Sequence, residues 1–129
     1  MIKINDKEYK KYNINISWGS FSSTLMGKKI NGISPFIKFN INDSILLGLE
    51  LIFSKEMFME TPINEKVDIT RYLTDITYED GNGWISIIIG NYTCHITRIN
   101  EKEFFFDFHI YNDEYNILNI TINSTISIL

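Results

Sequence analysis

His95, Asp107 and His109 are the side chains of this sequence whose types and spacing best fit acid–base or metal chemistry. A His beside an Asp is the usual pairing of a general base, and two His with one Asp are typical ligands of a divalent metal ion. An ordinary solvated sheet face carries the same residue types, and a flat face lacks the concavity that a catalytic site needs. We therefore keep the three residues as catalytic candidates, but expect a non-catalytic protein with no bound metal and no cofactor.

The stretches that carry these residues, Tyr92–Ile99 and Phe104–Tyr111, alternate apolar and polar side chains. This period of two predicts the two strands of an antiparallel hairpin with one dry and one polar face. A five-residue connection would place His95 opposite Asp107, whereas a three-residue connection would place His95 opposite His109. In either register the three candidates share the polar face, where opposed Cβ atoms lie about 5 Å apart.

Cys94 is the single cysteine, which excludes an intramolecular disulfide framework and zinc-finger spacings. Successive strand residues point to opposite faces, so Cys94 cannot form a nucleophile–base pair with His95. We expect a small buried thiol instead. A free thiol and the absence of an apolar signal stretch at the start of the sequence predict a cytoplasmic protein.

Charge is divided unevenly along the chain and supplies most candidates for partner binding. Residues 1–38 hold seven Lys and two acids, about +5, while residues 39–129 hold five Lys or Arg and fourteen acids, about −9. Acidic loops of this kind would steer a basic protein partner. The partner-binding candidates are the acids expected in loops or at strand ends and three aromatic residues expected at the surface: Glu56, Glu60, Glu79, Asp80, Asp113, Glu114, Phe58, Phe105 and Tyr111.

Other classes of partner fit the composition less well. A pI of about 5.1 argues against nucleic acid. No apolar run approaches the roughly 18 residues of a membrane span, and the glycines match no phosphate-binding loop. The basic residues of the N-terminal segment, about 1–34, could dock on the acidic loops or on those of a second copy. The second arrangement would be a homodimer in which an exposed edge strand adds backbone pairing.

The rest of the chain shows the same alternation and predicts an all-β fold. Strands are expected in residues 14–18, 35–41, 44–53, 84–89 and 117–128 as well as in the hairpin. Two stretches lack it. Phe21–Ser34 is Ser-, Lys- and Gly-rich and is expected to be a loop, with a loop that contains a short irregular strand as the alternative, and Lys55–Pro62 is expected to be an edge or loop. Ile69, Tyr72 and Leu73 are spaced as in a helix, with Asp68 as N-cap, which predicts one short helical turn near Asp68–Thr74.

The stretch Val67–Leu73 resembles a turn of galactose-binding-like jelly rolls, in which a strand ends in an Asp-Ile/Val-Thr turn closed by Leu. The resemblance implies a sandwich, and in those domains this turn packs the core and does not touch sugar. Strands separated by turns every 8–12 residues are typical of a sandwich or barrel. We expect a single antiparallel β-sandwich domain, residues 1–129, whose buried residues include Leu47, Leu49, Leu51, Ile85, Ile87, Cys94, Ile96, Phe106, Phe108, Ile120 and Ile122.

Composition adds a source and narrows the function classes. The chain has no Ala, no Gln, one Val and 25 Ile, a bias typical of an AT-rich bacterial or phage genome. The leading hypothesis is a non-catalytic cytoplasmic interaction module, such as an inhibitor or immunity-type protein or a structural protein of a phage or mobile element. The alternatives are a carbohydrate-binding jelly-roll module and a small metal-dependent enzyme that uses His95, Asp107 and His109.

Overall fold

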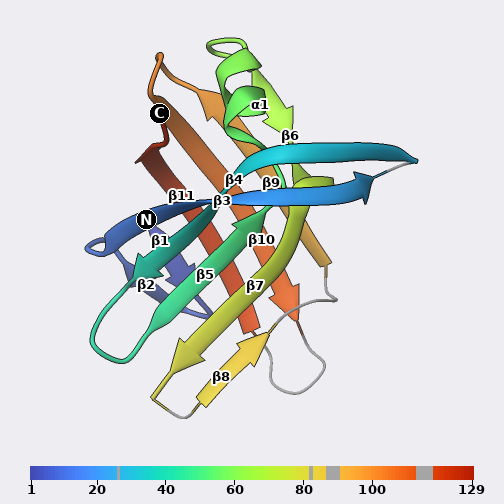
Figure 1. Ribbon diagram of the computed structural model, residues 1–129. Helices are drawn as coiled ribbons and strands as arrows, with labels where there is room; N and C mark the ends of the chain where they lie inside the picture. The colour runs from blue at the N-terminus through green and yellow to red at the C-terminus, as the bar shows by residue number, and fades with distance from the viewer. Residues whose placement is uncertain (26, 82, 87–90, 113–117) are drawn as a thin grey trace.

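Alternating apolar and polar residues build two antiparallel sheets that pack face to face (Figure 1). The computed structural model describes residues 1–25, 27–81, 83–86, 91–112 and 118–129. The predicted all-β sandwich is therefore confirmed. Within these ranges no helix is long and apolar enough to cross a membrane.

The six-stranded sheet carries the His/Asp candidates. Its strand order is β2-β1-β11-β10-β9-β6. The strands, in chain order, are β1 (Ile2–Ile4), β2 (Lys7–Tyr9), β6 (Lys66–Asp68), β9 (Asn91–Arg98), β10 (Glu103–Asn112) and β11 (Leu118–Ser127). The short strands β1, β2 and β6 were not expected from the sequence, because three residues are too few to show a period.

The five-stranded sheet has the order β3-β4-β5-β7-β8. Its strands are β3 (Asn13–Leu25), β4 (Lys28–Asn40), β5 (Leu46–Leu51), β7 (Leu73–Asp80) and β8 (Gly83–Ser86). Strand β7 escaped the sequence analysis because its pairing with β5 shifts between Glu50 and Leu51. This bulge lets Leu73 and Ile76, which differ in parity, both face the core.

The prediction of a loop over Phe21–Ser34 is wrong. β3 and β4 form one hairpin whose register runs without a shift from Asn13↔Asn40 to Leu25↔Lys28. Only Phe36–Asn40 of β4 also pairs with β5, so the distal half of the hairpin is a two-stranded ribbon. Figure 1 shows this ribbon reaching past the remaining strands of its sheet. This part of the hairpin is rich in Ser, Lys and Gly, so its sequence lacks apolar alternation.

In the described ranges, two short helices interrupt the strands. A 3₁₀ turn, η1 (Thr70–Tyr72), confirms the helical turn predicted near Asp68–Thr74, although its N-cap is Ile69 rather than Asp68. The helix α1 (Lys55–Glu60) occupies the stretch expected to be an edge or loop. Ser54 caps α1, since its Oγ accepts a hydrogen bond from the Met57 N–H at 3.1 Å.

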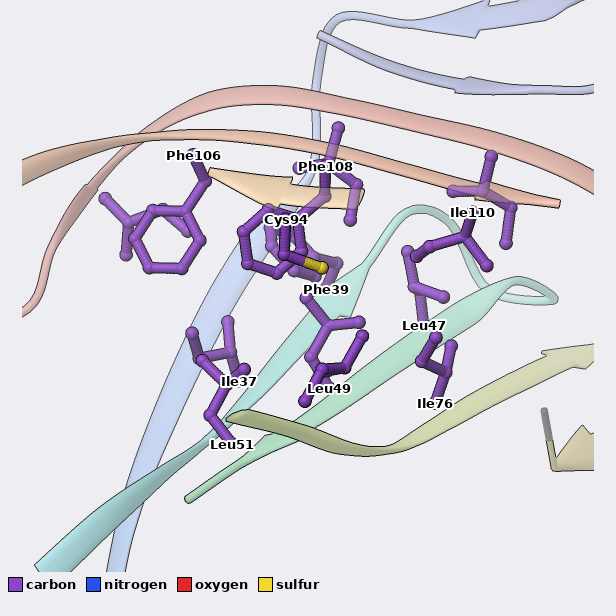
Figure 2. Packing of buried hydrophobic residues seen from close by; sticks show 14 of the residues in the cluster. Ile37, Phe39, Leu47, Leu49, Leu51, Ile76, Cys94, Phe106, Phe108 and Ile110 are labelled. Atoms are coloured by element: carbon purple, nitrogen blue, oxygen red, sulfur yellow. The ribbon is translucent and has the colours of Figure 1, made fainter. Parts of the chain in front are cut away.

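The core lies between the two sheets (Figure 2). Strands β4, β5 and β7 supply one wall, and β9, β10 and β11 supply the other. The predicted core residues Leu47, Leu49, Leu51, Cys94, Ile96, Phe106, Phe108, Ile120 and Ile122 are all 0% exposed, which confirms them. Ile87 lies outside the described residues, as does the side chain of Ile85.

Candidate functional site

His95 and Asp107 lie directly opposite each other on β9 and β10. This is the register of the five-residue connection, and the alternative that places His95 opposite His109 is wrong because His109 pairs with Thr93. Phe106 is buried and its neighbour Phe105 is only half-buried, so Asp107 shares the outer face of the sheet with Phe105. The sequence therefore predicted the face that this pair shares and left the register open between two alternatives, of which the structure has the first.

The charged partner of His95 is Asp68, at the end of β6, with Nε2 and Oδ2 3.8 Å apart. The Thr70 side chain and the Thr70 backbone N–H, which donates to Oδ1 at 2.8 Å, lower the pKa of Asp68. The carboxylate is therefore ionised at neutral pH. Sequence analysis treated Asp68 only as a helix cap, because β6 is too short to be recognised as the strand that brings it beside His95.

Asp107 has partners of its own on both sides. Lys66 Nζ lies 3.7 Å from its Oδ2, and the side chain of Asn123 on β11, with its amide in the orientation that satisfies both its neighbours, donates to its Oδ1 at 2.9 Å. Strands β6, β10 and β11 thus hold Asp107 in a row of polar side chains across the outer face of the sheet.

His109 is tied to a different neighbour. Its Nε2 lies 2.8 Å from Asn119 Oδ1, across the β10–β11 pair. Among the described residues, no group of three or more His, Cys, Asp or Glu side chains is arranged to hold a metal ion. The candidates share one sheet face, but each engages a separate partner, so they do not converge on one reacting atom.

Cys94 points into the core, on the opposite face from His95, and is 0% exposed. Burial raises the pKa of the Cys94 thiol far above its ordinary value, so the thiol is protonated at neutral pH. The prediction of a small buried thiol is confirmed. Its backbone N–H donates to Thr70 Oγ1 at 2.9 Å, which fixes η1 against β9.

The acidic partner-binding candidates do not form one surface. Glu56 and Glu60 lie on α1 rather than in a loop. Glu79 and Asp80 lie at the end of β7, which reaches the opposite end of the molecule from α1 (Figure 1). Asp113 and Glu114 lie outside the described residues. The two described acidic pairs therefore lie far apart on the molecule.

The expectation that Phe58 is exposed is wrong. Its side chain is 0% exposed and packs edge-on against Phe53 and Phe104, with ring centroids 4.6 and 5.1 Å away. One helical turn places Phe58 on the core side of α1 and leaves Met59 on the solvent side, 58% exposed. Phe105 and Tyr111 are half-buried on the outer face of the six-stranded sheet, as expected.

The length and edge position of β3 are the main features that the sequence did not reveal, since alternation predicted a strand only in residues 14–18. This strand is the outermost of its sheet, and its far side pairs with no described strand. Thirteen residues long, β3 contains no charged residue and no proline. Gly27, between β3 and β4, has a φ of +78°, which suits a hairpin tip.

No protein family, no curated protein and no solved structure matches the chain.

Proposed function

We propose that this protein is a non-catalytic interaction module that binds an extended segment of a partner protein along β3. Strand addition of this kind uses main-chain hydrogen bonds for affinity and alternate side chains for specificity. The supporting observation is the edge itself: a thirteen-residue outermost strand, without charge, proline or register shift. Long uncharged edges pair readily with other chains, so natural proteins blunt or cover them.

Two of the other sheet edges carry the usual protection. Strands β2 and β6 are three residues long and contain charged residues, Lys7 and Glu8 in the first and Lys66 and Asp68 in the second. Strand β8, also at an edge, has four residues. Short, charged edges offer few backbone groups to a partner. The absence of such protection on β3 is what supports its assignment as the binding edge.

The charge around β3 favours an acidic partner. No Asp or Glu occurs between Glu8 and Asp43, whereas β4 carries Lys28, Lys29 and Lys38. Neither Lys28 nor Lys29 forms an ion pair with another described residue. A partner segment with an uncharged centre and acidic ends would pair along β3 and place its acids near these lysines. This partner is opposite in charge to the basic one expected from the sequence.

The pairing of β3 with β4 determines which backbone N–H groups of β3 face an added strand. Trp18 pairs with Pro35, which has no N–H, so this position is a pair without hydrogen bonds between β3 and β4. Such pairs alternate along an antiparallel ladder, and Ser22 therefore has the same character as Trp18. Its N–H points to the free edge and is available to an added strand.

The experiment uses a labelled synthetic peptide of alternating Thr and Ile with Glu at both ends, and a second peptide with Lys at both ends. Fluorescence anisotropy should show that the wild type binds the Glu-ended peptide more tightly. Ser22→Pro should abolish binding because it removes an outward donor, while Ser22→Thr keeps that donor and should bind as the wild type does. Binding that survives Ser22→Pro, or no binding to the wild type, would refute strand addition at β3.

Light scattering separates the homodimer from the acidic partner. A wild-type dimer that Ser22→Pro converts to a monomer would mean that a second copy occupies β3, and the proposed acidic partner would then be wrong.

We place this activity in the cytoplasm, a location that suits the free thiol of Cys94.

A further inference from the structure

The outer face of the six-stranded sheet is hollowed where β6 leaves the edge of β9. β6 pairs with β9 only from Lys66↔Thr97 to Asp68↔His95. The next backbone contact runs from the Ile69 N–H to the Cys94 carbonyl, at 2.8 Å, and the chain then turns away as η1. β9 continues beyond this point with no described strand on its open side. The resulting depression has a volume of about 880 Å³, within the range of small-molecule sites.

Its floor is formed by two cross-strand pairs of β9 and β10, Thr93↔His109 and Asn91↔Tyr111. These residues offer a hydroxyl, an amide, an imidazole and a phenol ring. Asn119 engages Nε2 of His109, so the other ring nitrogen, Nδ1, is the one that can serve a ligand. Tyr111, half-buried, presents an aromatic surface beside these polar groups.

The wall of the depression carries charges of both signs. Asp68 and Arg71 line it together with Thr70. The Asp68 side chain is 63% exposed; its Oδ1 accepts a hydrogen bond from the Thr70 N–H, and its Oδ2 lies 3.8 Å from His95 Nε2. The guanidinium of Arg71 lies 5.2 Å from the ring centroid of Tyr72, which holds it beside the depression.

This lining discriminates between ligand charges. An anion would face the Asp68 carboxylate, and a cation would face the Arg71 guanidinium. A hydroxyl group both donates and accepts hydrogen bonds, so it suits either neighbour. The ring of Tyr111 suits the flat C–H face of a cyclic molecule, because aromatic side chains contribute apolar contact area at a polar site.

We propose that this depression binds a neutral, hydroxyl-rich ring compound, a mono- or disaccharide, through Asp68, Asn91, His109 and Tyr111. The site lies on the opposite sheet from β3, so it is independent of the interaction proposed there. It also draws Asp68 and Thr70 from the turn at the end of β6, which the sequence suggested was a core-packing element alone.

The test is a titration followed by ¹H–¹⁵N NMR with glucose, galactose, N-acetylglucosamine and cellobiose as probes. Inorganic phosphate and putrescine serve as charged comparisons. At least one neutral sugar should give saturable shifts at Thr93 and His109, and neither charged probe should. No saturable shift with any of these sugars, or binding of phosphate or putrescine at the same amides, would overturn the proposal.

Variants locate the site. Tyr111→Ala should weaken sugar binding about fivefold to tenfold, from the loss of aromatic contact. Asp68→Asn should weaken it as well, and this change keeps an acceptor for the Thr70 N–H, so the turn should stay folded. Asp107 lies on the same sheet face outside the depression, so Asp107→Asn should bind the sugar as the wild type does. Equal affinity of all three variants would show that the sugar binds elsewhere.

Discussion

Gly32 on β4 lies against Ser54, the N-cap of α1, so closely that a Cβ on Gly32 would stand 3.2 Å from the Ser54 Cβ. The φ of Gly32 is +152°, a backbone conformation that side-chain-bearing residues rarely adopt. Lys55, the first residue of α1, places its Nζ 5.5 Å from the ring centroid of Trp18 on β3. The base of the two-stranded ribbon is thus seated on the start of α1, and a glycine is what permits the close approach.

Gly32→Ala should therefore destabilise the protein by about 1–3 kcal/mol, through backbone strain and the forced shift of Ser54. Gly19→Ala is the matched control, since Gly19 is on the same hairpin and a Cβ added there would meet no atom within 4 Å. Urea unfolding of both variants measures the difference. Equal stability of the two variants would mean that Gly32 is not a constrained contact.

Phe58→Ala should cost about 3–5 kcal/mol, because it empties a site at the centre of an aromatic cluster. The adjacent Met59→Ala should change stability by less than about 0.5 kcal/mol, since Met59 is 58% exposed. Thermal unfolding of the two variants side by side tests which face of α1 packs on the core. A larger loss for Met59→Ala would reverse the assignment.

Arg98→Lys should lower the unfolding free energy by about 1–3 kcal/mol, because Arg98 donates to four backbone carbonyls at once. Nη1 donates to those of Met59 and Thr61 at 2.8 and 3.0 Å, and Nε and Nη2 to residues 100 and 101 at 3.1 and 2.8 Å. A Lys ammonium cannot span these positions. Amide hydrogen exchange should then rise in α1, and an unchanged exchange rate there would contradict this role of Arg98.

Acid should remove the stabilisation that ionised Asp68 provides. Hydrogen bonds from Thr70 make its pKa lower in the folded than in the unfolded chain. Such a group stabilises the fold above its unfolded-state pKa, about 4, and the effect is lost as pH falls through the folded pKa. The unfolding free energy of the wild type minus that of Asp68→Asn should therefore be larger at pH 7 than at about pH 3. A difference that is constant with pH would refute the stabilising role of ionised Asp68.

The hairpin of β9 and β10 could be predicted from the sequence because both its faces are specified. Cys94 and Phe106 need the core, and His95 and Asp107 need solvent, so a slip by one residue would bury charges. The same reasoning failed for residues 21–34, which extend beyond the part of β4 that pairs with β5 and in which Ser, Lys and Gly show no period of two. Alternation of apolar and polar residues indicates that one face of a strand is buried, so strands that project from the sheet do not show it.

The candidate site was only partly predictable for a related reason. Asp68 reaches His95 through a three-residue strand, and the depression beside it exists because that strand ends at Asp68. Pairing between β6 and β9 joins segments far apart in the sequence, which no local pattern reveals. Likewise, six residues of helix between Ser54 and Thr61 are too few to show the period that would have placed Phe58 inside.

The neighbour of β1 in the six-stranded sheet is β11, paired from Ile2↔Ile122 to Ile4↔Ile120. β1 therefore cannot be hydrogen-bonded on both sides until β11, which lies far along the chain, has been synthesised. Closing so long a loop is entropically costly, and sheets built on such pairings fold slowly. Until then, β3 has been synthesised and its uncharged edge can pair with another chain. We therefore expect newly made chains to aggregate more as the rate of expression rises.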